Sequence, residues 1–169
     1  MMILFTLIIR KETTGANMTI GLSKIMVGID GSKESVNAAD YAIAIAKRYN
    51  AELIAVNVLT SDIGYAYSSP GVESPSLTIR EIILLAEDEV KKWFNDIKEK
   101  ADRNGIRFRS EIIMAKRSAV STMVDYAEEQ KIDLIAVGTR GRSGIKKMLL
   151  GSVASGLVTY AACPVLVVK

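Results

Sequence analysis

The chain has 169 residues, of which 49% are hydrophobic and 24% are charged. This length suits one domain with a single core, and the composition is that of a globular protein rather than a disordered one. The chain has no histidine, which excludes Ser-His-Asp and Cys-His catalysis and zinc-hydrolase chemistry. Its one cysteine, Cys163, cannot form a disulfide within the chain. We interpret Cys163 as a small buried residue rather than a reactive thiol.

The formal net charge is only +3, but the cations are unevenly distributed. No Asp or Glu occurs from Leu134 to Lys169. The basic residues of that segment are Arg140, Arg142, Lys146, Lys147 and Lys169. A local cationic patch of this kind favours a small anionic ligand over a long track for nucleic acid.

Residues 1–22 are predicted to form an N-terminal extension ahead of a domain that spans residues 23–169. The apolar run from Met1 to Ile9 is far shorter than the roughly 20 residues needed to span a bilayer. It also lacks the basic region and cleavage site of a signal peptide. The extension is either an arm or extra edge strand, or a mis-assigned start with Met18 as the initiator, and we favour the second. With the single cysteine, these features predict a cytoplasmic protein.

Strands and helices are predicted to alternate along the domain. The predicted strands cover residues 23–30, 52–59, 106–114, 132–139 and 164–168, and the predicted helices cover residues 32–50, 77–104, 118–130 and 152–162. Most of these strands are apolar on both faces, which calls for a parallel sheet with helices on both sides. In such α/β sheets, ligands bind outside the carboxyl ends of the strands, where the strand order reverses.

Three segments carry further information. The first helix has an apolar stripe at Val36, Ala39, Ile43 and Ala46, and the long helix has one at Ile82, Ala86, Val90, Trp93, Ile97 and Ala101. Residues 61–76 are rich in serine, glycine and proline, which predicts a long surface loop that acts as a lid or a partner surface. Residues 106–114 alternate between apolar and polar, as a strand near a sheet edge does.

The sequence GIDGS places Asp30 at the end of the first predicted strand. A carboxylate in that position must find hydrogen-bond donors, a metal or solvent. One interpretation is an Asx-turn that caps the following helix. The other is a binding role, in which Asp30 contacts a ribose hydroxyl or, through water, a phosphate-bound Mg²⁺.

The stretch GTRGRSGIKKMLLGS follows the fourth predicted strand. It matches neither a Walker A loop nor a dinucleotide fingerprint, but it has Gly138, Gly141, Gly151 and Ser152 at the spacing G-x₂-G-x₉-G-[ST]. Glycines allow backbone N–H groups to approach an anion without a Cβ in the way. Gly151 and Ser152 begin a helix, whose free N–H groups favour phosphate.

This spacing resembles the ATP-binding motif of the universal stress protein family. KIMVGIDGS is similar to that family's first strand and turn, IDLIAVGTRGRSG to its fourth strand and loop, and LLGSVA…CPVLVV to its ending. The resemblance covers residues 23–169. It implies an α/β fold of three layers, Rossmann-like and of the adenine nucleotide alpha hydrolase type, with a doubly wound five-stranded parallel sheet in the order 3-2-1-4-5.

The resemblance also implies a set of nucleotide-binding residues and no catalytic residue. The set is Gly28, Ile29, Asp30, Val58, Val137, Gly138, Arg140, Gly141, Gly151, Ser152 and Val153. Asp30 would anchor the ribose, the backbone of Val58 would meet the adenine, and the glycine motif would hold phosphates. Mg²⁺ or Mn²⁺ would bind through the phosphates of ATP, with Asp30 reaching it at most through water. Where many members have a Gly-x-Pro turn, this chain has KRSAV, residues 116–120.

The last strand, from Pro164 to Val168, is expected at the sheet edge. Members of the family commonly form a homodimer through this strand, which implies a two-fold interface here. The alternative is an edge covered by the N-terminal arm, since an unprotected edge invites pairing.

We expect an ATP-binding universal stress protein that works as a nucleotide-dependent switch or sensor in stress response. Because no water-activating base is visible near the phosphates, any ATP hydrolysis should be slow or depend on a partner. One alternative is a member that binds AMP or cyclic AMP, or no nucleotide, and acts through protein contacts of residues 61–76. A less favoured alternative is a nucleic-acid-binding module, because the cations lack interleaved aromatic residues.

Overall fold

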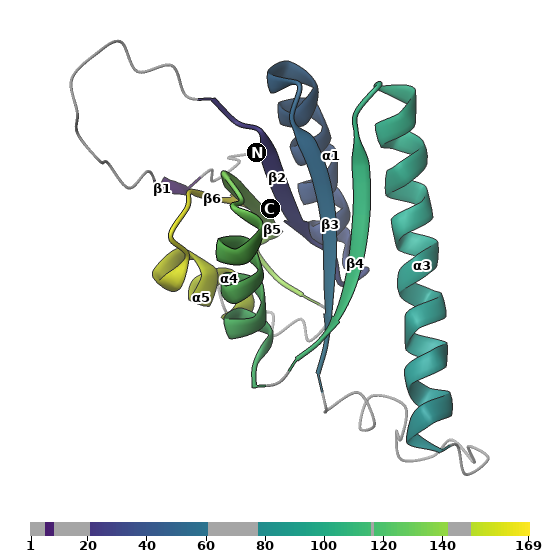
Figure 1. The fold of residues 1–169 in the computed structure, drawn as a ribbon. Coiled ribbons are helices and arrows are strands. Elements are labelled where there is room, and N and C mark those ends of the chain that lie inside the picture. The colour runs from purple at the N-terminus through teal and green to yellow at the C-terminus, as the bar shows by residue number, and fades with distance from the viewer. Residues whose placement is uncertain (1–5, 9–20, 61–77, 116, 142–149) are drawn as a thin grey trace.

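The structure is a computed structural model that describes residues 6–8, 21–60, 78–115, 117–141 and 150–169. Strands and helices alternate along the chain (Figure 1), as the sequence predicts. The strands are β1 (Thr6–Ile8), β2 (Lys24–Gly28), β3 (Glu52–Leu59), β4 (Phe108–Met114), β5 (Leu134–Gly138) and β6 (Val165–Val168). The helices are α1 (Lys33–Tyr49), α3 (Ile79–Arg103), α4 (Ala119–Gln130) and α5 (Ser152–Tyr160). The predicted loop at residues 61–76 lies outside the described residues.

The sheet has the order β1-β6-β5-β2-β3-β4. Strands β2 to β6 pair with one another in parallel, which confirms the predicted five-stranded parallel sheet and its order 3-2-1-4-5. The strand order reverses between β2 and β5, since the chain moves from β2 outward to β4 and then returns to the other side of β2. The carboxyl ends of β2 and β5 are therefore side by side, with Val27 paired to Ala136 near those ends.

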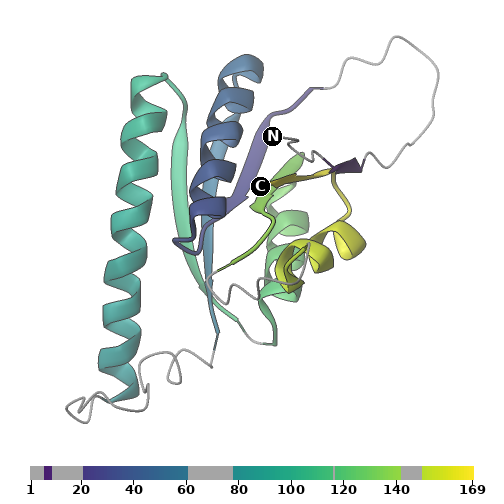
Figure 2. The same cartoon turned by 180° about the vertical axis from the view of Figure 1, so that it is seen from behind.

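Helices cover both faces of the sheet, so the molecule has three layers. Helices α4 and α5 lie on the face seen in Figure 1, and α1 and α3 lie on the face seen in Figure 2. The buried apolar residues fall into two clusters, one under each helix pair. Strand β4 is the edge next to β3, as its alternating sequence predicts, and most of its residues are only partly buried.

The helix ends follow from local sequence. Ser32 and Thr78 cap α1 and α3 by accepting hydrogen bonds from backbone N–H groups of their first turns. Asn50 directly follows α1, and Gly105 lies just beyond α3. Both residues have a positive φ, as is common after the last turn of a helix. Helix α5 differs, because its N-cap is Gly151 and no side chain caps it.

One predicted core position is wrong. In α1, Val36 is 37% exposed, and Ser35 is buried instead. Ser35 tolerates burial because its hydroxyl donates to the backbone oxygen of Ser32 at 2.9 Å. In α3, Trp93 is half-buried and packs against the core, and the neighbouring Phe94, which the predicted stripe does not include, is buried.

The last strand does not form the sheet edge. Strand β1 pairs antiparallel with β6, and its register places Leu7 opposite Leu166. The edge strand that the sequence predicts at residues 164–168 is therefore the second strand from the edge. This pairing matches the alternative in which an N-terminal arm covers β6.

Gly138 provides space for α1 at the end of β5. A Cβ at position 138 would lie 2.7 Å from the backbone carbon of Glu34 and 2.9 Å from the nitrogen of Ser35. The absence of this Cβ lets the first turn of α1 pack directly on the end of β5.

A Gly138→Ala substitution should therefore lower the free energy of unfolding by about 1–3 kcal/mol, the usual cost of overpacking. Gly21→Ala is the matched control, because nothing lies within 4 Å of a Cβ there. Urea denaturation of both variants checks this, and equal stability of the two would contradict the packing role assigned to Gly138.

Candidate functional site

A cavity of about 210 Å³ lies at the point where the strand order reverses. It is bounded by the turn after β2, the end of β3, the loop after β5 and the first turn of α5. The first turn of α4 adds Ala119 and Met123. This is the position in which doubly wound sheets bind their ligands.

All the site residues that the sequence predicts line this one cavity. They are Gly28, Ile29, Asp30, Val58, Val137, Gly138, Arg140, Gly141, Gly151, Ser152 and Val153. The structure thus brings together residues that lie more than 120 positions apart in the chain. The other cations of the loop, Arg142, Lys146 and Lys147, lie outside the described residues.

Asp30 belongs to a tight turn after β2. Its Oδ1 accepts hydrogen bonds from the backbone N–H of Ser32 at 3.0 Å and from the Ser32 hydroxyl at 2.6 Å. The first of these is the Asx-turn that the sequence allows. The Ser32 hydroxyl also accepts from the N–H of Ser35, so the same cluster caps α1.

The second carboxylate oxygen of Asp30 faces the glycine loop. A Cβ at Gly141 would lie only 2.5 Å from Asp30 Oδ2. A residue larger than glycine at position 141 would therefore have to displace the Asp30 carboxylate. The Ser32 hydroxyl also lies 3.4 Å from the backbone oxygen of Arg140, so the two turns are in contact across the cavity.

Thr139 joins three elements at the other side of the cavity. Its N–H donates to the backbone oxygen of Val168 at 2.7 Å, and its own backbone oxygen accepts from the N–H of Gly151 at 2.7 Å. The start of α5 is thus fixed beside the end of β5. No side chain caps α5, so its first N–H groups have no side-chain acceptor, and the residues of its first turn from Ser152 to Ala154 line the cavity.

Buried polar atoms without a partner gather at this cavity. Among the described residues, four buried side-chain polar atoms lack a hydrogen-bond partner, and three of them belong to residues that line the cavity. These three are Asn57 Oδ1, Thr139 Oγ1 and Arg140 Nε. Native proteins rarely leave such atoms unpaired, so their concentration here indicates a place where a polar ligand belongs.

Sequence reasoning missed Asn57 and Thr139 as residues of the site. Asn57 is the only strongly polar residue within the apolar part of ELIAVNVL, and Thr139 directly follows the fourth strand. Both signals were visible in the sequence, but only the structure shows that both residues are buried against the cavity.

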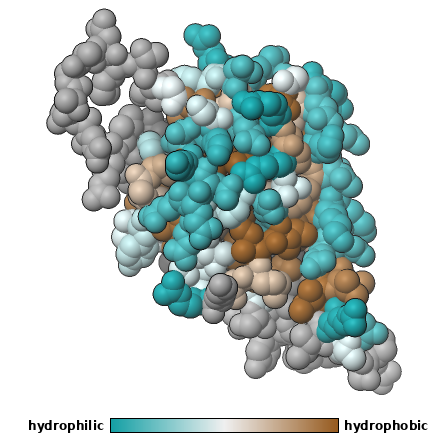
Figure 3. All heavy atoms as spheres, viewed as in Figure 1, coloured by the Kyte–Doolittle hydropathy of each residue, from teal (hydrophilic) through white to brown (hydrophobic). Residues whose placement is uncertain are grey.

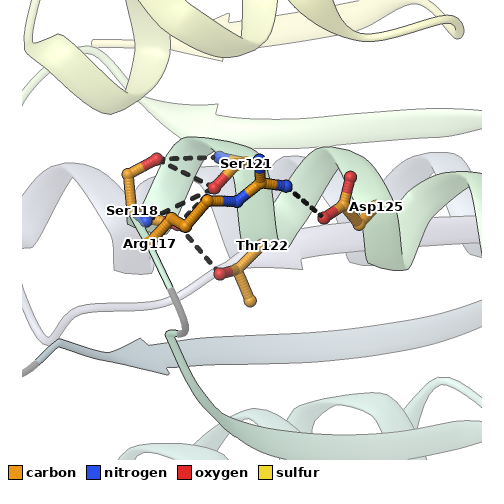
Figure 4. A network of polar contacts seen from close by, with 5 residues as sticks. All are labelled: Arg117, Ser118, Ser121, Thr122 and Asp125. Carbon is orange, nitrogen blue, oxygen red and sulfur yellow. Dashed lines mark hydrogen bonds and ion pairs between the residues drawn. The ribbon is translucent and has the colours of Figure 1, made fainter.

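Hydroxyl groups form the hydrogen bonds at the start of α4, where residues 117–120 lie. Figure 4 shows Ser118 at the start of α4, where its Oγ accepts from the N–H of Ser121 at 3.1 Å and its backbone oxygen accepts from the Thr122 hydroxyl at 2.8 Å. Arg117 forms an exposed ion pair with Asp125, with 3.7 Å between the charged atoms. A serine cap therefore starts α4 in this chain; Lys116 lies outside the described residues.

The described residues offer little direct metal chemistry. They contain no group of three or more cysteine, aspartate or glutamate side chains that could hold a metal ion. Asp30 is the only carboxylate among the cavity-lining residues. Partial burial raises the pKa of the Cys163 thiol to about 11, so this cysteine is a neutral thiol near pH 7. It is only partly buried, whereas the sequence predicts a buried residue.

A doubly wound parallel sheet with a glycine-lined cavity at its reversal point is the architecture of the Rossmann-like α/β proteins. The model of the universal stress protein family matches residues 21–169. The chain therefore belongs to the universal stress protein family. None of the helices in the described ranges has both the length and the apolar character of a membrane-spanning segment.

Relatives with curated descriptions agree with this assignment. The chain is 38% identical over 147 residues to the universal stress protein MJ0531 of Methanocaldococcus jannaschii, an alignment that covers 86% of this chain and 81% of that protein. It is 36% identical over 148 residues to the universal stress protein YxiE of Bacillus subtilis, which covers 87% and 99% of the two chains.

Solved structures share the fold. The hypothetical protein MJ0577 superposes with a TM-score of 0.74 at 24% identity, covering 89% of this chain and 97% of that one. A universal stress protein in complex with cAMP superposes with a TM-score of 0.64 at 26% identity, covering 88% and 98%. A universal stress protein from Archaeoglobus fulgidus in complex with dAMP has a TM-score of 0.60 at 19% identity, covering 89% of this chain and 100% of that one. A universal stress protein family protein from Arabidopsis thaliana with AMP bound has a TM-score of 0.61 at 14% identity, covering 87% and 91%.

Proposed function

We propose that this chain is a cytoplasmic protein that binds an adenine nucleotide, with ATP as the main ligand. It works as a nucleotide-dependent switch or sensor in the stress response. The observation that carries the proposal is the cavity at the β2–β5 reversal, where unpaired buried polar atoms and the uncapped start of α5 come together. The solved neighbours with cAMP, dAMP and AMP support an adenine nucleotide as the ligand class.

Each part of the cavity suits a different part of the nucleotide. The uncapped N–H groups of α5 and the Arg140 guanidinium suit the phosphates, because both present donors to negative charge. Asp30 suits a ribose hydroxyl, which can donate to a carboxylate. The end of β3 at Val58 suits the adenine, whose edge can pair with backbone groups.

A divalent cation would enter with the nucleotide. Because Asp30 is the only carboxylate that lines the cavity, Mg²⁺ or Mn²⁺ would be held mainly by phosphate oxygens and water, which Mg²⁺ prefers in nucleotide sites. When bound, the cation would neutralise phosphate charge. The chain's own residues would then orient the nucleotide rather than coordinate the metal.

A Gly141→Ala variant tests the nucleotide site. The added Cβ would displace the Asp30 carboxylate, so we expect the affinity for ATP to fall about tenfold, equivalent to roughly 1.4 kcal/mol. Isothermal titration calorimetry with nucleotide-free protein measures this, and Gly21→Ala serves as the control with an unchanged Kd. If the wild-type protein binds none of ATP, AMP and cyclic AMP, the proposed function is wrong.

Hydrolysis should be slow. Among the residues that line the cavity, none is a histidine or a glutamate, and Oδ1 of the one aspartate, Asp30, is engaged by Ser32. We expect fewer than about one ATP hydrolysed per second per chain, at the bottom of the usual enzyme range. A phosphate-release assay with Mg²⁺ checks this, and faster turnover by the purified protein alone would contradict a switch role.

A second candidate is an interaction protein, and one observation favours it. Leu84 and Leu85, near the start of α3, are 50% and 48% exposed. Figure 3 shows that hydrophobic residues gather toward the lower right of an otherwise mainly hydrophilic face, where Figure 1 places the start of α3. The start of α3 directly follows residues 61–77, so the partner surface expected there would continue onto this helix.

Self-association through β6 is also part of the proposal. Copies of the chain would pair their β6 strands antiparallel about a two-fold axis. Strand β1 occupies the same edge, with three residue pairs from Thr6↔Val167 to Ile8↔Val165. Pairing of two copies therefore requires β1 to leave, so the two arrangements compete.

A variant that starts at Met18 should shift toward the dimer, because it lacks the competing strand. Sedimentation velocity of both forms at equal concentration measures the shift, and the full chain is expected to contain more monomer. The same distribution in both forms would show that β1 does not control association.

A further inference from the structure

Asn57 is a polar side chain within an apolar strand. It is the sixth residue of β3, and only 7% of it is exposed. Burying an amide is unfavourable unless its hydrogen bonds are made, so an asparagine here calls for a specific partner.

The partner is the turn that carries Asp30. Asn57 Nδ2 donates to the backbone oxygen of Ile29 at 2.6 Å. The N–H of Ile29 donates to the backbone oxygen of Val56 at 2.9 Å. Both backbone polar groups of Ile29 are therefore held by β3, and Asp30 is the next residue in the chain.

The other side of the turn is held by α3. Gly31 has a φ of 79°, in the left-handed region that favours glycine. A Cβ at Gly31 would overlap the ring of Trp93, so the indole lies directly against this backbone. The turn is thus fixed at Ile29 and at Gly31, the two neighbours of Asp30.

The amide makes only part of its possible hydrogen bonds. Asn57 Oδ1 is buried and has no partner. An apolar residue of similar size would avoid this unpaired acceptor but would leave the oxygen of Ile29 unpaired instead. Replacing Asn57 by leucine therefore exchanges one unpaired buried acceptor for another, and the fold should gain or lose little.

We propose that Asn57 is a positioning residue for the nucleotide site, which orders the turn of residues 29–32 through Ile29 and thereby sets the orientation of the Asp30 carboxylate. This inference rests on the proposed function and adds a residue on β3 that acts on the ligand through another side chain. It predicts that Asn57 matters for affinity through Asp30, with little effect on stability.

A double-mutant cycle tests the coupling. The variants are Asn57→Leu, Asp30→Ala and the pair, and Asn95→Leu on the exposed face of α3 is the control. For ATP we expect Asn57→Leu to raise the Kd about tenfold in the wild-type background and less than about twofold in the Asp30→Ala background. The Asn57→Leu melting temperature should stay within about 3 °C of the control.

Two outcomes of the cycle would overturn the inference. Equal losses of affinity in both backgrounds would mean that Asn57 acts independently of Asp30. A large loss of stability with unchanged affinity would mean that Asn57 serves only the fold. If Asn57→Leu does not fold, Asn57→Ala replaces it, because alanine likewise cannot donate to the oxygen of Ile29, adds no charge to the cavity and should give the same loss.

Hydrogen exchange separates this inference from the proposed function. In the nucleotide-free protein, the amides of Ile29 and Ser32 should exchange about tenfold faster in Asn57→Leu than in Asn95→Leu, because local opening of the turn becomes easier. Absence of nucleotide binding by the wild-type protein would refute the proposed function, and the exchange rates would still decide the role of Asn57. Unchanged exchange would overturn the ordering of the turn.

Discussion

The contact between the Asp30 carboxylate and the backbone of Gly141 is the constraint on which the site depends. Asp30 lies in the turn after β2, on one side of the point where the strand order reverses. Gly141 lies in the loop after β5, on the other side. Because a Cβ at position 141 would lie 2.5 Å from Asp30 Oδ2, a larger residue there would push the Asp30 carboxylate aside. Asp30 and Gly141 together line the cavity, and the described start of the glycine loop lies beside Gly151 at the start of α5.

The supporting structure keeps those two turns in place. The β2 turn is held by Asn57 from β3, by Trp93 from α3 and by the cap of α1 at Ser32. The described start of the β5 loop is held by the two backbone hydrogen bonds of Thr139. Hydrogen bonds and packing within the chain thus fix the β2 turn and this start of the loop, and such prior order reduces the ordering cost of binding a ligand. Among the described residues, three of the four buried side-chain polar atoms without a partner belong to residues that line the cavity.

Much of this arrangement could be predicted from the sequence, because it depends on local patterns and on spacing. Apolar strands that alternate with helices predict a covered parallel sheet, and the spacing of Gly138, Gly141, Gly151 and Ser152 locates the loop. Other features depend on contacts between distant segments. The phase of α1, which buries Ser35 rather than Val36, is set by packing on β5, and the pairing of β1 with β6 joins the two ends of the chain. The role of Asn57 likewise follows from a hydrogen bond across 28 residues.

The central claim is that the cavity between the β2 turn and the β5 loop is where an adenine nucleotide binds. Backbone amide chemical shifts of ¹⁵N-labelled, nucleotide-free protein, recorded during a titration with ATP and Mg²⁺, test this most directly. We expect the largest changes at Asp30, Gly141 and Ser152, with small changes in α4 beyond Met123. Changes centred on the outer face of α4, or none at saturating ATP, would contradict the account.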